Sequence, residues 1–449
     1  MQSFHDTPPA WRLAGALALV PAASVAFRFL DWGAGPARGL ILFEALLAMA
    51  LLGCPGRAAT VGPRLSLLVN AVLAAAMAIW LAAGVRTIAE VARGGAIPLD
   101  QGQTTFRAAR LLLRGQNPYG AGALVDFQTF FDRLPAREAA GIGPTLPRAA
   151  LNPALAAYDR DLSAKARAPL LPAAPASGPA ALEAHLVGYK YGALLPLLAL
   201  PVAAAKFPAG IMALNALAAV LTLAALYALM RGEVGDERLA RLGLAALLCD
   251  NTILFNYVEK SATDVFALLA CAGAALAAQR GRPGLAGAAL GLGFGCKIFP
   301  CALMLPLLLK GGRARPALIF AAVTAAIYLP FALAGLSGLL HNVFLWPAYL
   351  GLDSTSWLAF APPGTAVIAR AVGLAGMALA WGRHLTGREP SHYRTLAIVA
   401  LLALVSSGAF HNNYVPWASI WIVAALVERF GPARREAKSA TAAEVYAAV

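Results

Sequence analysis

The stretch 284–309, GLAGAALGLGFGCKIFPCALMLPLLL, is an apolar run whose only charged residue is Lys297, near its centre. The basic sequences RGR and KGGRAR flank it on either side. As one straight helix, the run would be about 39 Å long and would hold Lys297 near the middle of a membrane, at a cost of roughly 2.5–3.5 kcal/mol. If both basic sequences lie in the cytoplasm, the chain instead reverses within the run. We favour the second arrangement and predict two short helices that meet at residues 296–300, with Lys297 at the outer turn.

The composition places the rest of the chain in a membrane as well. Of its 449 residues, 60% are hydrophobic and 13% are charged, whereas soluble domains carry about 25% charged residues. Only helices and closed barrels satisfy every backbone polar group in lipid, and long continuous apolar runs are typical of helices. We therefore predict an all-α, polytopic integral membrane protein. The net charge of +14 lies largely in short loops, where it indicates orientation rather than nucleic-acid binding.

With these basic loops in the cytoplasm, we expect about twelve transmembrane helices and both termini inside. The expected spans are 13–30, 38–53, 64–86, 208–230, 240–256, 265–279, the two arms of 284–309, 315–335, 361–382, 394–410 and 414–428. The chain then divides into three N-terminal spans (1–86), an external loop with interfacial helices (87–207), a C-terminal transmembrane bundle (208–428) and a cytoplasmic tail (429–449).

The apolar stretch 185–208 is an exception, because Pro196 and Pro201 interrupt it. As a full crossing it would force the basic loop RGEVGDERLAR to the outside. We therefore expect a kinked interfacial helix or a re-entrant helix here.

The external loop begins with the stretch 97–120, IPLDQGQTTFRAARLLLRGQNPYG. Its apolar residues recur at helical spacing with arginines opposite, which predicts a short helix on the membrane surface that Gly115 ends. Asp100 at its start has two possible roles. It is either a base that takes a proton from a substrate or the N-cap of this helix.

Polar residues that are costly in a membrane gather on the outer face in this topology. A site with carboxylates, cations and aromatic rings at the level of the lipid headgroups suits a substrate that contains both a sugar and a phosphate. The residues concerned are Asp100, Glu259, Lys260, Asp264, Lys297, His341, Asp353 and His411.

Four segments together resemble the GT-C superfamily of polyprenyl-phosphate-sugar-dependent glycosyltransferases, most closely the alpha-mannosyltransferases of glycosyltransferase family 87. They are RAARLLLRGQNPYG, YKYGALLPLLALP, LAGAALGLGFGCKIFP and HNNYVPW. In such families an acid in the first external loop is the base, and Asp100 is the nearest match. It precedes Phe106 by six residues instead of four, which leaves Gln101 and Gln103 as alternatives for the aligned position. The expected Tyr-Pro-Pro is Tyr-Gly-Ala at 191–193.

The resemblance implies a GT-C-like bundle that transfers mannose or a similar hexose from a polyprenyl-phosphate donor to a lipid or glycan acceptor. The site would face outward from the cytoplasmic (inner) membrane. Asp100 would be the general base, and Lys297, His341 and His411 would bind the donor phosphate. Contacts to the sugar or acceptor are assigned to Glu259, Lys260, Asp264, Gln103, Tyr119 and Asp353. The expected partners are membrane lipids and the two substrates, with no metal, no cofactor and no nucleic acid.

Two other functions fit part of the sequence. An O-antigen polymerase or ligase also uses lipid-linked substrates, and it normally has arginines in external loops, as Arg107, Arg110 and Arg114 would be here. A transporter or flippase of lipid-linked sugars would be expected to have polar groups at the membrane midplane and inverted repeats. The sequence has few such polar groups and no obvious repeat.

Overall fold

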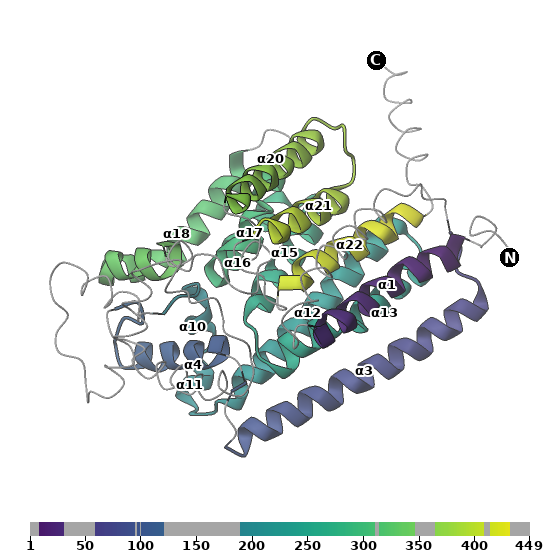
Figure 1. Cartoon of the computed structure of the whole chain (residues 1–449). Helices are drawn as coiled ribbons and strands as arrows, with labels where there is room; N and C mark the ends of the chain where they lie inside the picture. Colours follow the sequence, from purple (N-terminus) through teal and green to yellow (C-terminus); the bar gives the residue numbers. More distant parts are fainter. Residues whose placement is uncertain are drawn as a thin grey trace.

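The computed structural model describes residues 9–30, 59–94, 97–98, 100–120, 189–309, 314–345, 364–407 and 414–431. Every regular element in these ranges is a helix, as the composition predicts. Long helices form a bundle, and a small group of helices, α4, α10 and α11, packs at one end of it (Figure 1).

The bundle contains the long helices α1 (Pro9–Leu30), α3 (Pro63–Ala92), α12 (Ala209–Val234), α18 (Ala314–Leu339) and α20 (Thr365–Leu385). Its shorter elements are α13 (Glu237–Leu248), α14 (Asn251–Ile253), η3 (Leu254–Glu259), α15 (Asp264–Gln279), α16 (Pro283–Cys296), α17 (Ile298–Ala302), η4 (Leu305–Leu309), η5 (Leu340–Leu345), α21 (His392–Val405) and α22 (Val415–Phe430). The small group contains α4 (Asp100–Leu113), α10 (Leu194–Leu198) and α11 (Leu200–Ala204).

Four of the described helices, α3, α12, α18 and α20, are long and apolar enough to cross a membrane. The pair α13 and α14–η3 would make a fifth span, bent by 53°. The predicted total of about twelve spans therefore stays a prediction, and the expected span 38–53 lies outside the described residues.

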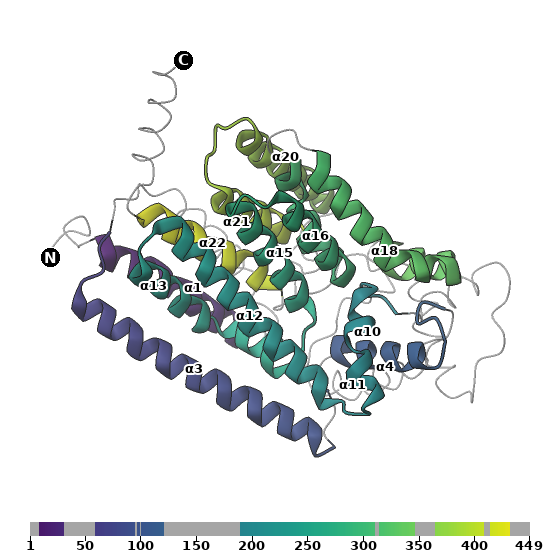
Figure 2. The ribbon, with the colours of Figure 1, turned by 180° about the vertical axis from the view of Figure 1, so that it is seen from behind.

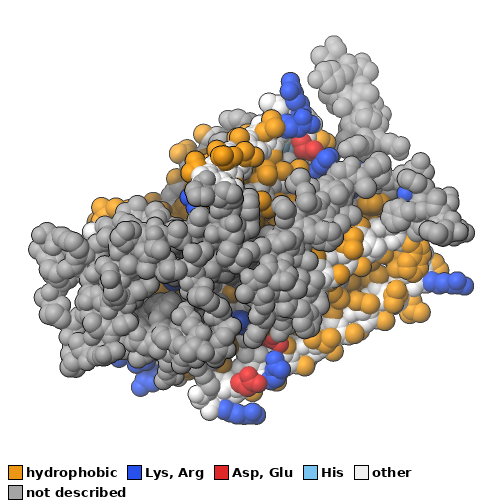
Figure 3. All heavy atoms as spheres, in the orientation of Figure 1, with side chains coloured by type: hydrophobic (Ala, Val, Ile, Leu, Met, Phe, Trp, Pro, Cys, Tyr) orange, Lys and Arg blue, Asp and Glu red, His pale blue; other side chains and the backbone are white. Residues whose placement is uncertain are grey.

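The surface of the long helices supports their placement in lipid. Hydrophobic side chains cover α3 between charged residues near its two ends (Figure 3). Leu67 and Leu81 of α3 are 73% and 70% exposed, and Leu333 of α18 is 80% exposed. Such fractions are costly in water and favourable against acyl chains.

Basic residues mark one end of the bundle, where several helices begin or end together. Gln279 at the end of α15 donates to the carbonyl of Leu229 on α12 at 3.0 Å, and its side chain lies 3.4 Å from the hydroxyl of Tyr393 at the start of α21. Ala59 donates to the carbonyl of Phe430 at 2.9 Å. We call this end, with Arg231, Arg280, Arg394 and Arg429, the arginine end, and the opposite end the lysine end after Lys297.

The chain reverses at Lys297, as predicted. A Cβ added to Gly287 would collide with the carbonyl of Pro316, and one added to Gly295 would lie 2.8 Å from Ile327, so α16 and α18 run parallel from the arginine end. The residues between them must return. A Cβ on Gly293 would lie 2.6 Å from the sulfur of Cys301, although residues eight apart in a straight helix are about 12 Å apart. The return arm consists of the short elements α17 and η4.

The expected straight span 240–256 is bent in the structure. Asp250 has an extended backbone between α13 and α14, and its side chain accepts from the backbone N–H of Thr252 at 2.9 Å. Ser419 on α22 donates to the other carboxylate oxygen at 2.7 Å. The buried carboxylate thus ends one helix, caps the next and fixes the bend against α22.

The proline-interrupted stretch forms α10 and α11, which lie beside α4 (Figures 1 and 2). Pro201 at the start of α11 has no N–H to continue a helix from α10. Together the two helices cover about 15 Å, roughly half of a hydrocarbon core. This agrees with the prediction of a kinked helix rather than a full crossing.

The close parallel contact of α16 with α18 predicts a sensitive position at Gly287. We expect Gly287→Ala to reduce the free energy of unfolding by about 1–3 kcal/mol, because the added methyl group meets backbone atoms of Pro316. Thermal unfolding in detergent measures this. The control is Gly273→Ala in α15, where no atom lies within 4 Å of the added Cβ. Equal melting temperatures for the two variants would contradict the contact.

Candidate functional site

The first turn of α4 is fixed to the start of α15. The side-chain oxygen of Gln101 accepts from the backbone N–H of Thr263 at 2.8 Å and from its hydroxyl at 3.2 Å. Gly102 packs so closely against Ser261 that a Cβ would collide with the serine hydroxyl. Asp100 opens α4, so its backbone lies beside the segment that leads to Asp264. The side chain of Asp100 lies outside the described set.

Asp264 and Lys297 form an ion pair at the lysine end. The Asp264 side chain is completely buried, whereas that of Lys297 is 17% exposed. The ammonium group also lies 4.9 Å from the ring centre of Tyr414 and 5.4 Å from that of Trp417. A carboxylate and two aromatic faces thus hold the one basic group of the reversal in a largely dry setting.

The YKYG segment joins α4 to the reversal. Gly192 donates its N–H to the carbonyl of Cys296 at 3.1 Å, and Tyr189 donates to the carbonyl of Pro118 at 2.8 Å. A Cβ on Gly192 would lie 2.5 Å from the Cys296 carbonyl oxygen, so only glycine fits. A proline at this position would also lack the N–H that makes the bond, which accounts for the departure from Tyr-Pro-Pro.

A cluster of buried tyrosines holds these segments together. Tyr119 donates its hydroxyl to the carbonyl of Tyr191 at 2.8 Å, and the hydroxyls of Tyr189 and Thr105 lie 2.9 Å apart. Burial raises the pKa of Tyr119 and of Tyr189 well above the usual range, so both phenols are neutral. Gln103 donates to the carbonyl of Ile97 at 2.6 Å. Tyr119 and Gln103 therefore have structural partners, and their contact with a sugar stays a prediction.

Glu259 and Lys260 lie at the end of η3, also at the lysine end. Glu259 accepts from Arg86 of α3 at 2.9 Å and is 21% exposed. It therefore pairs with α3. The Lys260 ammonium lies 4.3 Å from the ring centre of Phe255. The contacts of Glu259 and Lys260 with a sugar or acceptor stay predictions.

Besides Asp100, three predicted site residues have no described side chain. His341 is in η5, but its side chain lies outside the described set, and Asp353 and His411 are entirely outside it. Conversely, Tyr414 and Trp417 contact Lys297 and were not predicted as site residues. Their spacing of three residues at the start of α22 was the available signal, because it places both rings on one helix face.

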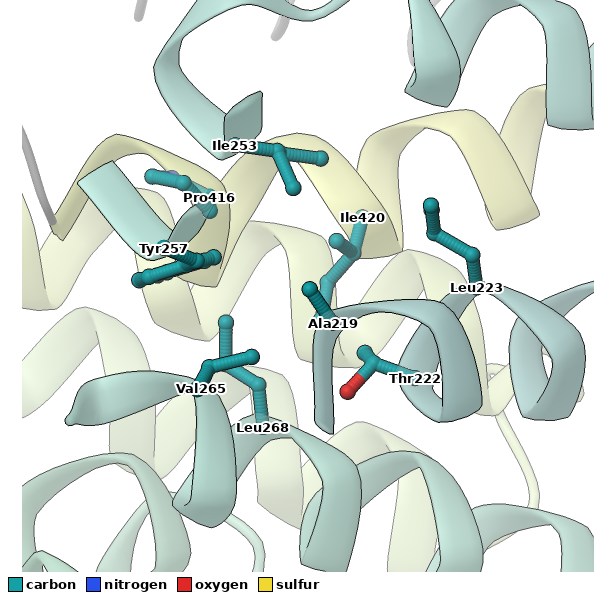
Figure 4. Close-up of a pocket in the computed structure, with 9 residues that line it drawn as sticks. All are labelled: Ala219, Thr222, Leu223, Ile253, Tyr257, Val265, Leu268, Pro416 and Ile420. Carbon is teal, nitrogen blue, oxygen red and sulfur yellow. The ribbon is translucent and has the colours of Figure 1, made fainter. Parts of the chain in front are cut away.

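A small apolar cavity lies inside the bundle beside the Asp264–Lys297 ion pair, and Figure 4 shows its lining. Val265, which follows Asp264, faces it together with Tyr257 of η3 and Pro416 of α22. The other lining residues are Ala219, Thr222, Leu223, Ile253, Leu268 and Ile420. Among the described residues, no group of three or more His, Cys, Asp or Glu side chains forms a metal site.

The comparisons with known proteins bear on this site. No curated protein and no solved structure was found to match the chain. The sequence profile of glycosyltransferase family 87 matches residues 189–427, more than half of the chain. The match includes the YKYG segment, Asp264, Lys297 and Trp417, whereas Asp100 precedes it. The chain therefore belongs to glycosyltransferase family 87, with helices long and apolar enough to embed it in a membrane.

Proposed function

We propose that this glycosyltransferase moves a hexose, with mannose the first candidate, from a polyprenyl-phosphate donor to a hydroxyl group of a lipid or glycan acceptor. The supporting observation is that α4, the YKYG segment, the reversal and the start of α22 all converge around Lys297. The YKYG segment, the reversal and the start of α22 lie in three of the segments that resemble the family, and α4 overlaps the fourth. Family membership favours sugar transfer over transport of a lipid-linked sugar.

In the proposed reaction, the acceptor hydroxyl oxygen attacks the anomeric carbon of the donor sugar. The bond from that carbon to the phosphate oxygen breaks, and polyprenyl phosphate leaves with the electron pair. Asp100 takes the proton of the acceptor hydroxyl. The backbone supports this role, because Asp100 opens α4 and the next residue, Gln101, is bonded to Thr263 beside Asp264.

Lys297 is proposed to stabilise the departing phosphate. In the structure its charge is balanced by Asp264, and a phosphate would compete for the same ammonium group. The attraction between the ammonium group and a phosphate would be strong, because the site is largely shielded from water. His341 and His411 are proposed to assist at the phosphate. Glu259, Lys260, Asp264, Gln103, Tyr119 and Asp353 remain candidates for the sugar or the acceptor.

We propose that the lysine end faces outward from the cytoplasmic membrane. The arginine end contains basic residues from many helices, which is typical of a cytoplasmic face. A donor carried on a lipid reaches an outer site without any nucleotide, and the sequence has no evident nucleotide-binding motif.

Asp100→Asn tests the proposed base. The amide keeps the shape of the side chain but cannot take a proton, so we expect turnover to fall by about 10²–10⁴-fold. The assay is release of polyprenyl phosphate from polyprenyl-phosphate-mannose in the presence of a lipid acceptor. Glu90→Gln, an exposed carboxylate at the same end, is the control and should keep wild-type turnover. Wild-type turnover in Asp100→Asn would exclude this residue as the base.

Lys297 requires a paired design, because Lys297→Met alone leaves Asp264 buried without its counter-ion and costs roughly 3–5 kcal/mol. The double variant Lys297→Met/Asp264→Asn removes both charges. We expect it to melt near the wild-type temperature but to show a donor KM raised roughly tenfold or more. Lys206→Met, at an exposed lysine, is the control. A double variant with the wild-type donor KM would show that the pair serves the fold alone.

Chemical labelling tests the proposed orientation. Arg93 and Arg280 are exposed at opposite ends of the bundle. We expect a membrane-impermeant maleimide to label Arg93→Cys in intact cells and Arg280→Cys only after the membrane is opened. The reverse pattern would place the lysine end in the cytoplasm and reject an external site.

A further inference from the structure

Among the described residues near the site, Asn215 and Ser261 are completely buried and have polar groups without a hydrogen-bond partner. Asn215 of α12 is 0% exposed, and neither its amide nitrogen nor its oxygen has a hydrogen-bond partner in the described part of the chain. The hydroxyl of Ser261, also 0% exposed, is in the same condition. Buried polar groups are nearly always hydrogen-bonded, because an unsatisfied one destabilises the folded state. Three unsatisfied groups on two residues therefore require an explanation.

The position of Asn215 follows from the spacing along α12. Residues four and seven positions later, Ala219 and Thr222, line the apolar cavity together with Tyr257 and Val265 (Figure 4). Side chains four apart on a helix are neighbours on one face, with Cβ atoms about 5–6 Å apart. Asn215 therefore lies on the same inward face, one turn closer to the lysine end.

The residues one turn before Asn215 on α12 pack toward α4. Ile211 and Met212 belong to a hydrophobic cluster with Ile97 and Phe106. Ile97 and Phe106 lie on either side of Gly102 in the sequence. Along the axis of α12, Asn215 thus lies between the cavity and the first turn of α4.

Ser261 also lies beside the first turn of α4. It packs directly on Gly102 and precedes Asp264 by three residues. Its φ of 60° is in the left-handed region, a strained conformation for serine. The strained backbone holds the hydroxyl at the contact between α4, which begins with the proposed base, and the segment that leads to the Asp264–Lys297 pair.

We propose that Asn215 and Ser261 form a subsite for the hydroxyl groups of a sugar, an inference that rests on the proposed function. An amide supplies a donor and an acceptor, and a serine hydroxyl supplies both as well. Sugar hydroxyls need this combination because each of them donates and accepts. A phosphate would need donors only, and a metal ion would need acceptors only. The sugar belongs either to the donor or to the acceptor, and kinetics can separate the two.

The test uses the full-length protein in detergent with polyprenyl-phosphate-mannose and a lipid acceptor. Asn215→Leu removes the unsatisfied amide, so we expect a higher melting temperature together with a KM raised about tenfold or more for one substrate. The substrate affected identifies the source of the sugar. Ser261→Ala should raise the KM of the same substrate. The control is Thr222→Val, because the Thr222 hydroxyl already donates to the carbonyl of Ala218 at 2.7 Å; it should change neither KM.

An increase in melting temperature with both KM values unchanged in Asn215→Leu and in Ser261→Ala would overturn the subsite and indicate buried water at most. The shift in melting temperature on adding each substrate is measured in parallel, because it needs no turnover. A shift in the wild type that is lost in Asn215→Leu supports the subsite even if no sugar is transferred, in which case only the proposed reaction fails. No shift with either sugar-bearing lipid overturns the subsite.

Discussion

The charge of Lys297 constrains the rest of the structure. An ammonium group is too costly in the middle of the hydrocarbon, so the chain reverses around it and presents it at the end of the bundle. The parallel contact of α16 with α18 then follows, since both helices must leave from the arginine end. The same reversal exposes the Cys296 carbonyl to Gly192 and brings the start of α22 over the ammonium group. One charged side chain thus organises elements that are far apart in the sequence.

The reversal could be predicted because its causes are local: one lysine in an apolar run and arginines on both sides. The bend at Asp250 could not, because its cause is a hydrogen bond to Ser419 on a helix 169 residues away. The partner of Glu259 could not be predicted either, since Arg86 lies on α3, 173 residues earlier in the sequence. Sequence periodicity likewise finds apolar runs but does not show which of them are long enough to cross alone.

For the candidate site, the sequence predicted Lys297 and Asp264 separately, and the structure brings them into contact. The sequence did not predict Tyr414 and Trp417 as contacts of Lys297, because aromatic residues near a membrane surface are ordinarily interfacial. Asn215 gave no signal either. A single asparagine in an apolar helix indicates a site only when the structure shows that none of its described neighbours forms a hydrogen bond with it.

The completely buried Asp264 side chain has a consequence for the catalytic cycle of the proposed reaction. An ammonium group alone would hold the spent lipid phosphate tightly, and the enzyme would suffer product inhibition. In the proposed reaction, Asp264 would compete with the phosphate for the ammonium group of Lys297 and so shorten the residence time of the product. The carboxylate would thereby promote release of polyprenyl phosphate and restore the Asp264–Lys297 ion pair of the unliganded enzyme.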